Sequence, residues 1–529
     1  MTNSENVAPG SMKREAKICR VKMKSGILRG TCEEGYLCFR GIPYGHAERF
    51  KAPETAIWDK ELDCTVFGKK AIQVYDIPRP WIKELPKREE FSEDCLNLNI
   101  YVPSQEPADI PESGLPVLVE IHGGSFQNGS NQGHSPQRVI RDHSFIYVAI
   151  NYRLGALGFL PLEGMLGEEY RGSGNCGILD QLCALKWIHE NIEAFGGNPG
   201  KVTLLGSSAG AKSIGALMMM IDKTNDYVDQ VILSSGASQS IRSMDTGTKT
   251  TQKFLETAAE VLGYPVMAVD LLTLPADDIL RVQKQFVDCQ GNTCMFGPVA
   301  DGFVLPENWE AFAQEGTLWS GNAMIGSSRN ELWFMEMMNP LLYQSAEAEA
   351  RGLFGCNAPL AVSAYEKLTA CEREKSGCEP TVEFKNRTWV RVFSDYMYRM
   401  YSYRLAARLS EKGCKVWQYS VEFPPAMHCF DQTLAFEDPS MIFMGNKDGL
   451  ETAEAVGKAI YESFAGFVEY GAPNGKPKDS CEEIPEWLME WQPLSDEKAC
   501  QMSWDKNSRV VEIPEDDVLE GFPEGVYRL

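Results

Sequence analysis

The sequence predicts an α/β fold with a large, mostly parallel central sheet flanked by helices. Residues 116–124 (PVLVEIHGG) and 145–153 (FIYVAINYR) are nearly continuous apolar runs rich in β-branched side chains, a pattern typical of parallel strands buried on both faces. A helical pattern over residues 178–192 separates them from a further apolar run at residues 202–205. Strand, helix and strand joined by short connections form the repeating unit of an α/β fold.

The predicted helix has apolar side chains on one face and a clear end. Gly196, Gly197 and Pro199 end it, because glycine often closes a helix and proline cannot continue one. Its apolar positions at helical spacing are Ile178, Leu182, Leu185, Trp187, Ile188 and Ile192. Shorter strand-like runs precede it at residues 18–23, 35–45 and 96–103.

Nothing in the sequence marks a boundary between domains. The 529 residues could form several domains by length alone, but the chain contains no internal repeat, low-complexity tract or long Pro/Ser linker. The first residues are polar and unpatterned. We therefore expect a flexible tail over residues 1–15 and a single domain over residues 16–529.

Composition excludes several classes of function. A formal net charge of -23 opposes a nucleic-acid partner, because phosphate binding needs a basic face. The N-terminus has no apolar signal region, and no run approaches the roughly 18 apolar residues of a membrane helix. The sixteen cysteines are scattered and form no metal-type CxxC pair, so reduced thiols are expected. These features together predict a soluble cytoplasmic protein with no metal site. They leave its oligomeric state open.

The stretch GSSAG at residues 206–210 contains the candidate nucleophile. It lies between a predicted strand and a predicted helix, as the strained GxSxG nucleophile elbow requires. Gly206 and Gly210 have no Cβ to clash as the chain reverses. Ser208 is the central residue, at a helix N-terminus that favours a developing negative charge. Such five-residue matches also mark ordinary tight turns.

A serine nucleophile needs a histidine base and a carboxylate that orients it. In α/β-hydrolases the chain order is Ser, Asp or Glu, then His. Of the six histidines only His428 follows Ser208, so it is the candidate base. Many carboxylates lie between the two residues. Glu331 is the preferred acid because it directly follows a short apolar strand. Asp301 in GPVADGF is the alternative, with a turn or capping role as its structural interpretation.

Backbone N–H groups must then stabilise the oxyanion of an acyl intermediate. The glycine pair after the strand at residues 117–121 lets the backbone approach a substrate oxygen closely. Gly124 and Ser125 are two candidate donors, and Ala209, directly after the nucleophile, is the third. His122 before this loop is expected to be structural.

With these residues the chain resembles the type-B carboxylesterases, the family that also contains the cholinesterases. The resemblance implies an α/β-hydrolase fold with helical insertions over the active site. It also implies the triad Ser208, Glu331 and His428, the three oxyanion donors, and a supporting serine at Ser235. It extends from about Val21 to the end of the chain, through GILRG, FRGIPYG, EDCLNLNIYVP, IHGGSF, NYRLGALGFL, GNCGILDQLCALKWIHENIEAFGGNPGKVTLLGSSAGA, SSGAS, GPVADGFVLP and FVEYGAPN.

Departures from the family pattern narrow the range of substrates that we expect. Ser207 stands where most relatives have a glutamate, so a choline substrate is disfavoured. Ser125 replaces a usual third glycine and keeps its N–H group. Cys95 normally pairs with a cysteine just before a glutamine, but Ile72 precedes Gln73 and the nearest cysteine is Cys64, which puts that disulfide in doubt.

The sequence therefore predicts a serine carboxylesterase that hydrolyses small-molecule esters through an acyl-enzyme, without a metal or organic cofactor. An acyltransferase or amidase with the same triad remains an alternative, because either could share the acyl-enzyme. A non-catalytic adhesion protein is disfavoured, because such relatives lack a triad member and all three are present here. Aromatic candidates for the substrate pocket include Trp81, Phe126, Phe296 and Trp333, although each taken singly fits the core better.

Overall fold

The structure is a computed structural model. It describes residues 17–74, 86–103, 112–140, 143–220, 226–290, 296–308, 319–475, 491–495 and 499–513. The expected tail at residues 1–15 and the pocket candidate Trp81 lie outside the described residues.

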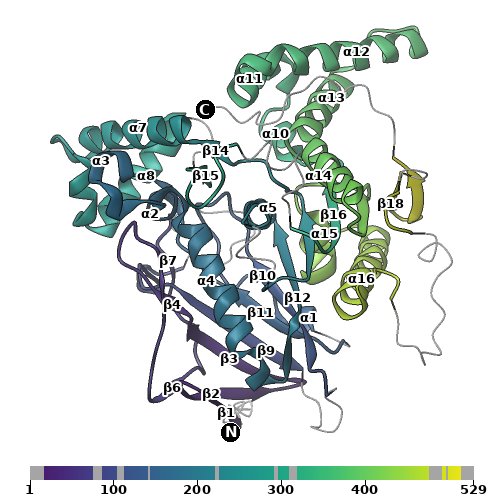
Figure 1. Ribbon diagram of the computed structural model, residues 1–529. Helices are drawn as coiled ribbons and strands as arrows, with labels where there is room; N and C mark the ends of the chain where they lie inside the picture. The colour runs from purple at the N-terminus through teal and green to yellow at the C-terminus, as the bar shows by residue number, and fades with distance from the viewer. Residues whose placement is uncertain are drawn as a thin grey trace, which may run out of the picture.

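A twisted sheet forms the centre of the molecule (Figure 1). Among the described residues it has thirteen strands, in the order β1 (Lys17–Met23), β2 (Gly26–Glu33), β3 (Tyr36–Pro43), β9 (Asn97–Pro103), β11 (Ile146–Ile150), β10 (Leu115–Ile121), β12 (Gly197–Ser207), β13 (Gln230–Ser234), β16 (Asn322–Ser328), β17 (Val416–Val421), β18 (Cys500–Trp504) and β19 (Arg509–Glu512), with β6 (Glu61–Asp63) beside β2. Two-residue strands pair outside it: β4 (Gly45–His46) with β5 (Glu54–Thr55), β7 (Lys70–Ala71) with β8 (Phe91–Ser92), and β14 (Arg242–Ser243) with β15 (Val299–Ala300).

The central strands are parallel and the outer strands are antiparallel. Every neighbouring pair from β11 through β10, β12, β13, β16 and β17 to β18 is parallel. The pairs β1–β2, β2–β3 and β3–β9 are antiparallel, as are β9–β11 and β18–β19. Tight connections such as residues 24–25 between β1 and β2 allow only antiparallel neighbours, whereas parallel neighbours need a longer crossover. The predicted mostly parallel sheet is thus confirmed for the centre.

Helices cover the sheet and build out one end of the molecule (Figure 1). They are α1 (Pro136–Val139), α2 (Gly155–Phe159), α3 (Glu163–Leu166), α4 (Cys176–Asn191), α5 (Ala209–Leu217), α7 (Met244–Leu262), α8 (Ala276–Gln290), α10 (Trp333–Met338), α11 (Leu342–Phe354), α12 (Ala358–Ser376), α13 (Val382–Ser394), α14 (Met400–Glu411), α15 (Phe430–Phe436) and α16 (Lys447–Tyr470). One π-helical turn, η8 (Asp395–Arg399), joins α13 directly to α14.

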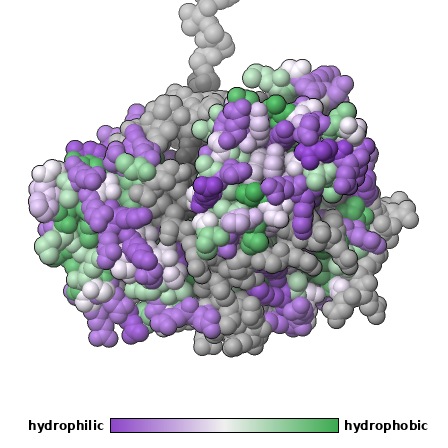
Figure 2. All heavy atoms as spheres, turned by 90° about the horizontal axis from the view of Figure 1, so that it is seen from above, coloured by the Kyte–Doolittle hydropathy of each residue, from purple (hydrophilic) through white to green (hydrophobic). Residues whose placement is uncertain are grey.

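Two apolar clusters lie on opposite faces of the sheet. Along β10, Val117, Val119 and Ile121 belong to one cluster, while Leu118 belongs to the other. Adjacent side chains of a strand point to opposite faces, so both faces are buried, as the continuous apolar runs predicted. The face seen from above in Figure 2 carries mostly hydrophilic side chains with apolar residues scattered among them. None of the helices in the described ranges is long and apolar enough to cross a bilayer.

Candidate active site

Ser208 occupies the sharp turn between β12 and α5. Its backbone angles, φ 53° and ψ -118°, lie outside the usual regions for a residue with a side chain. A Cβ on Gly206 would lie 2.5 Å from the carbonyl carbon of Gly210, and a Cβ on Gly210 only 1.9 Å from the carbonyl oxygen of Ile121. Both positions therefore require glycine, as predicted for an elbow.

The sequence-predicted residues follow the carboxyl ends of neighbouring parallel strands. Ser208 follows β12, Ser235 follows β13, Glu331 follows β16 and His428 follows β17. These four strands are consecutive in the sheet, and the loop with Gly124 follows β10 on the other side of β12. The carboxyl edge of a parallel sheet is where α/β proteins place their functional side chains.

The side chains of Glu331 and His428 are in contact, although the two residues are 97 positions apart in the chain. The His428 Nδ1 atom lies 2.5 Å from Glu331 Oε2. Glu331 is fully buried, and its other carboxylate oxygen accepts the backbone N–H of Ser328 at 2.7 Å. The His428 side chain keeps 29% exposure. The carboxylate therefore has a fixed orientation and binds the Nδ1 atom of an imidazole that stays partly exposed.

The alternative acid, Asp301, has a structural role. Its Oδ1 atom accepts backbone N–H groups from Phe303, Val304 and Leu305 at 3.0, 2.8 and 3.1 Å. Its Oδ2 atom accepts the Asn175 side-chain amide at 2.9 Å. These hydrogen bonds hold a loop closed, which agrees with the turn or capping role considered for Asp301 from the sequence.

The surroundings of His428 favour its charged form. Burial opposes the charge, but the neighbouring Cys429 side chain and the Glu331 carboxylate outweigh it and raise the pKa of His428 above its ordinary value. The ring of Tyr398 packs against the imidazole with centroids 4.8 Å apart. Tyr398 belongs to the π-helical turn η8, a type of irregularity found often at functional sites.

The loop after β10 reaches the elbow. Gly124 has φ +109°, and a Cβ there would lie 1.9 Å from the carbonyl oxygen of Asn128. Ser125, at φ 54°, also has a left-handed backbone. A Cβ on Gly123 would lie 3.3 Å from the Ser208 Cβ, so the loop and the candidate nucleophile are in direct contact. Ala209, the third candidate donor, is the first residue of α5 and is fully buried.

Ser235 connects the elbow to the segment that carries the histidine. Its backbone N–H donates to the Gly326 carbonyl at 2.9 Å, and its hydroxyl accepts the Cys429 N–H at 3.1 Å. Ser235 is therefore hydrogen-bonded to the residue next to His428. His122 stacks on Tyr152 at 4.4 Å and is buried, which agrees with the structural role expected of it.

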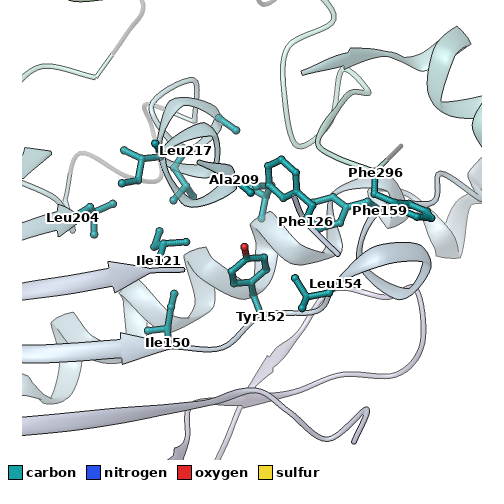
Figure 3. Packing of buried hydrophobic residues seen from close by; sticks show 14 of the residues in the cluster. Ile121, Phe126, Ile150, Tyr152, Leu154, Phe159, Leu204, Ala209, Leu217 and Phe296 are labelled. Carbon is teal, nitrogen blue, oxygen red and sulfur yellow. The ribbon is translucent and has the colours of Figure 1, made fainter. Parts of the chain in front are cut away.

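Two aromatic pocket candidates belong to the core. Phe126 and Phe296 are 2% and 1% exposed. Phe126 lies between Ala209 and Phe159 in Figure 3, and its ring meets the Phe159 ring edge-on at 4.9 Å. Trp333 is partly exposed on α10.

The sequence did not indicate Tyr398 or Cys429 as neighbours of His428. A π-helical turn and a contact between distant segments leave no periodic pattern in a sequence.

Comparison with known proteins adds to this geometry. The model of the carboxylesterase family matches residues 17–519. The chain belongs to the carboxylesterase family. Among curated relatives of this carboxylesterase, a para-nitrobenzyl esterase of Bacillus subtilis is 32% identical over 82% of this chain and 84% of its own length. A probable N-octanoylanthranilate hydrolase of Rhodococcus erythropolis is 29% identical over 79% of this chain and 85% of its own.

A solved structure supports the fold of this carboxylesterase. The crystal structure of a carboxylesterase from Geobacillus stearothermophilus superposes with a TM-score of 0.77 at 28% identity, covering 94% of this chain and 98% of the other. The predicted α/β-hydrolase fold is confirmed.

The cysteines of this carboxylesterase depart from the expected family pairing. Cys64 and Cys95 are both buried and both free. The other twelve cysteines within the described ranges are free as well. The same part of the chain contains no group of three or more His, Cys, Asp or Glu side chains that could hold a metal ion.

Proposed function

We propose that this carboxylesterase hydrolyses small-molecule carboxylic esters with Ser208 as nucleophile, His428 as base and Glu331 as acid. The observation that carries the proposal is the 2.5 Å contact between His428 Nδ1 and Glu331 Oε2, at the sheet edge that holds the strained Ser208 elbow. With Nδ1 bound to the carboxylate, Nε2 is the nitrogen left to accept a proton from serine.

Acylation would proceed in two moves. Ser208 Oγ attacks the ester carbonyl carbon while its proton passes to His428 Nε2. The carbonyl oxygen becomes an oxyanion that accepts hydrogen bonds from the N–H groups of Gly124, Ser125 and Ala209. The intermediate then collapses, the bond to the alkoxide breaks, and His428 gives its proton to the leaving alcohol.

Deacylation repeats these moves with water. His428 takes a proton from water as its oxygen attacks the acyl carbon, the same N–H groups stabilise the second oxyanion, and the proton returns to Ser208 as the acid leaves. Glu331 orients the imidazole and stabilises its charged form throughout, without accepting the proton itself.

The test is labelling with a fluorophosphonate, in which the serine oxygen displaces fluoride, alongside turnover of p-nitrophenyl butyrate. Peptide mapping should place the label on Ser208. The variant Ser208→Ala should lose label and reduce kcat by about 10⁴-fold or more. Ser207→Ala is the matched control, one residue away at the end of β12. Full activity in folded Ser208→Ala would contradict the assignment.

A second candidate activity is amide hydrolysis. It is favoured by the relative named as a probable hydrolase of N-octanoylanthranilate. The same acyl-enzyme would form, with His428 protonating an amine instead of an alcohol. Comparing p-nitrophenyl butyrate with its p-nitroanilide on one preparation decides between the two activities.

We also propose a cytoplasmic location. The fourteen free cysteines of the described chain support it, because a reducing compartment keeps thiols unpaired. Fractionation of the source cells with an antibody against the protein tests this.

A further inference from the structure

His122, which precedes the loop with two of the candidate oxyanion donors, is fixed by contacts of its ring and of its backbone. The imidazole stacks on the Tyr152 ring, with centroids 4.4 Å apart and an angle of 18° between the planes. The Tyr152 hydroxyl donates to the His122 carbonyl at 2.8 Å. The imidazole Nδ1 atom lies 2.8 Å from the carbonyl oxygen of Gly123. Both rings are buried, so little water competes for these contacts.

The Gly123 carbonyl determines which imidazole nitrogen carries the proton. A carbonyl oxygen can only accept a hydrogen bond, so Nδ1 is the nitrogen that donates. Burial lowers the pKa of His122 below 6.5, so near neutral pH the ring is neutral and has a single N–H group. The other nitrogen, Nε2, is buried and has no hydrogen-bond partner among the described residues. The proton of this imidazole is therefore used to hold the Gly123 carbonyl.

This hydrogen bond orients the peptide group between Gly123 and Gly124. Because the peptide is planar and trans, its C=O and N–H bonds point in opposite directions. A Cβ on Gly129 would lie 2.3 Å from His122 Nδ1 and 2.6 Å from the Gly123 oxygen, so this carbonyl is on the inner side of the loop at residues 123–129. The Gly124 N–H therefore points out of the loop, and it has no acceptor among the described residues. A Cβ on Gly123 would also lie 3.3 Å from the Ser208 Cβ, which places this donor beside the candidate nucleophile.

The other two candidate donors are oriented by backbone structure alone. The Gly124 carbonyl accepts the N–H groups of Gln127 and Asn128 at 3.0 Å each. This backbone turn orients the next peptide group and with it the Ser125 N–H. The Ala209 N–H is at the first position of helix α5. Of the three candidate donors, the Gly124 N–H is thus the one whose orientation depends on a hydrogen bond from a side chain.

We propose that His122 is a positioning residue that keeps the Gly124 N–H directed at the substrate oxygen. This inference rests on the proposed serine mechanism and adds a residue to it. Without the Nδ1 hydrogen bond this peptide can rotate, because neither glycine has a Cβ that restricts its backbone angles. Rotation would turn the Gly123 carbonyl toward the oxyanion and repel it. Because the hydrogen bond from Gly124 strengthens as negative charge develops, its loss should lower kcat more than it raises KM.

Two substitutions of His122 separate the hydrogen bond from the packing of the ring. His122→Phe keeps an aromatic ring against Tyr152 but has no N–H group to donate. His122→Asn loses the ring but can donate from its side-chain amide. With p-nitrophenyl butyrate, His122→Phe should lower kcat by about 10²-fold with little change in KM, the usual scale for losing one oxyanion donor. His122→Asn should recover most of this loss. Higher activity in His122→Phe than in His122→Asn would show that the ring acts by packing alone and would overturn the proposal.

A trifluoromethyl ketone inhibitor reports on the oxyanion directly. The serine oxygen adds to the ketone carbon, the serine proton passes to the base, and the ketone oxygen becomes an oxyanion that accepts the same N–H groups. The inhibition constant should rise in His122→Phe by about the factor by which kcat/KM falls. An inhibition constant equal to that of the wild-type protein would contradict the proposal. Circular dichroism verifies that each variant is folded. If His122→Phe does not fold, His122→Leu replaces it in both measurements, because leucine also lacks a donor.

His189→Phe is the matched control. His189 also packs on a tyrosine, Tyr227, with ring centroids 5.3 Å apart. Tyr227 precedes β13, whereas Ser235 of the candidate site follows this strand, so the control is at the opposite edge of the sheet. It should leave kcat and KM unchanged. Labelling of Ser208 by a fluorophosphonate keeps the two proposals apart. A labelled, active wild-type protein with an equally active His122→Phe would overturn the role of His122 alone. Absence of both labelling and turnover in the folded wild-type protein would instead overturn the serine mechanism.

Discussion

The residue after the candidate base controls how readily that base is charged. Cys429 follows His428 directly, has a left-handed backbone at φ 56°, and donates its N–H to Ser235. Its side chain, together with the Glu331 carboxylate, raises the pKa of His428. A histidine can accept a proton from serine only when it is neutral. The pKa of His428 therefore sets the lower pH limit of the proposed activity.

We expect Cys429→Ser to move this limit to lower pH. In the wild-type protein kcat/KM should rise with pH as His428 loses its proton, with a midpoint above 6.5. Removing the thiol removes one cause of the raised pKa, so the midpoint should fall while the profile keeps its shape. The measurement is kcat/KM for p-nitrophenyl butyrate across pH, with the exposed Cys371→Ser as control. An unchanged midpoint in Cys429→Ser would contradict the influence of the thiol.

At the scale of elements, a buried charge network connects β10 to α15. Glu120 on β10 lies 2.9 Å from His134 Nδ1 and accepts a hydrogen bond from Tyr147. His134 Nε2 lies 3.7 Å from Glu437, the residue that ends α15. Helix α15 starts just after His428, and β10 leads into the loop with Gly124. The network therefore joins the two segments that deliver the base and the oxyanion donors.

Glu120→Gln should lower the free energy of unfolding by about 3 kcal/mol near neutral pH, the usual scale for breaking a buried pair. Burial opposes the charge on His134, but Glu120 and Glu437 raise its pKa from 6.5 to about 10. While Glu120 is ionised, the stabilisation is complete below pH 6.5 and disappears as pH rises through about 10. The difference between wild type and variant should therefore shrink over that interval.

Urea unfolding at several pH values measures this difference. Glu462→Gln, at the partly exposed pair with His143, is the control and should change stability by less than about 1 kcal/mol. A difference for Glu120→Gln that does not vary with pH would show that the effect is packing and not charge.

At the scale of the whole molecule, both cores share one sheet. Trp187 and Trp389 lie in one apolar cluster, and Trp491 and Trp504 lie in the other, on the opposite face. Neither face can unfold without exposing the strands that the other face covers. We therefore propose, as the sequence predicted, that residues 16–529 form a single domain.

A single domain should unfold in one step. Tryptophan fluorescence and far-ultraviolet circular dichroism, followed in urea, should give coincident transitions, because the fluorescence samples both clusters. Two separated transitions would instead divide the chain into independent units.

Much of the fold could be predicted from the sequence, because buried parallel strands and elbow glycines leave local signals. The order of nucleophile, acid and base along the chain left His428 as the one histidine that could serve as the base. Glu331 was chosen over Asp301 only by its place after a strand, and its contact with His428 required the structure. The pairing of β9 with β3 and with β11, and the network of Glu120 and His134, depend on contacts between segments far apart in the chain. The packing of Tyr398 against His428 depends on an irregular helical turn.

The contact between Gly210 and Ile121 has a consequence for how such a protein can diverge. Any side chain at residue 210 would collide with the main chain of β10. The distance between α5 and β10 is therefore determined by a contact between their backbones. Side chains in the surrounding core can therefore be exchanged without moving the serine relative to the loop that follows β10. Mutations in this core can then alter which esters are bound while the positions of the serine and of this loop stay unchanged. Because of this glycine contact, the substrate preference can change through single substitutions that do not move the serine.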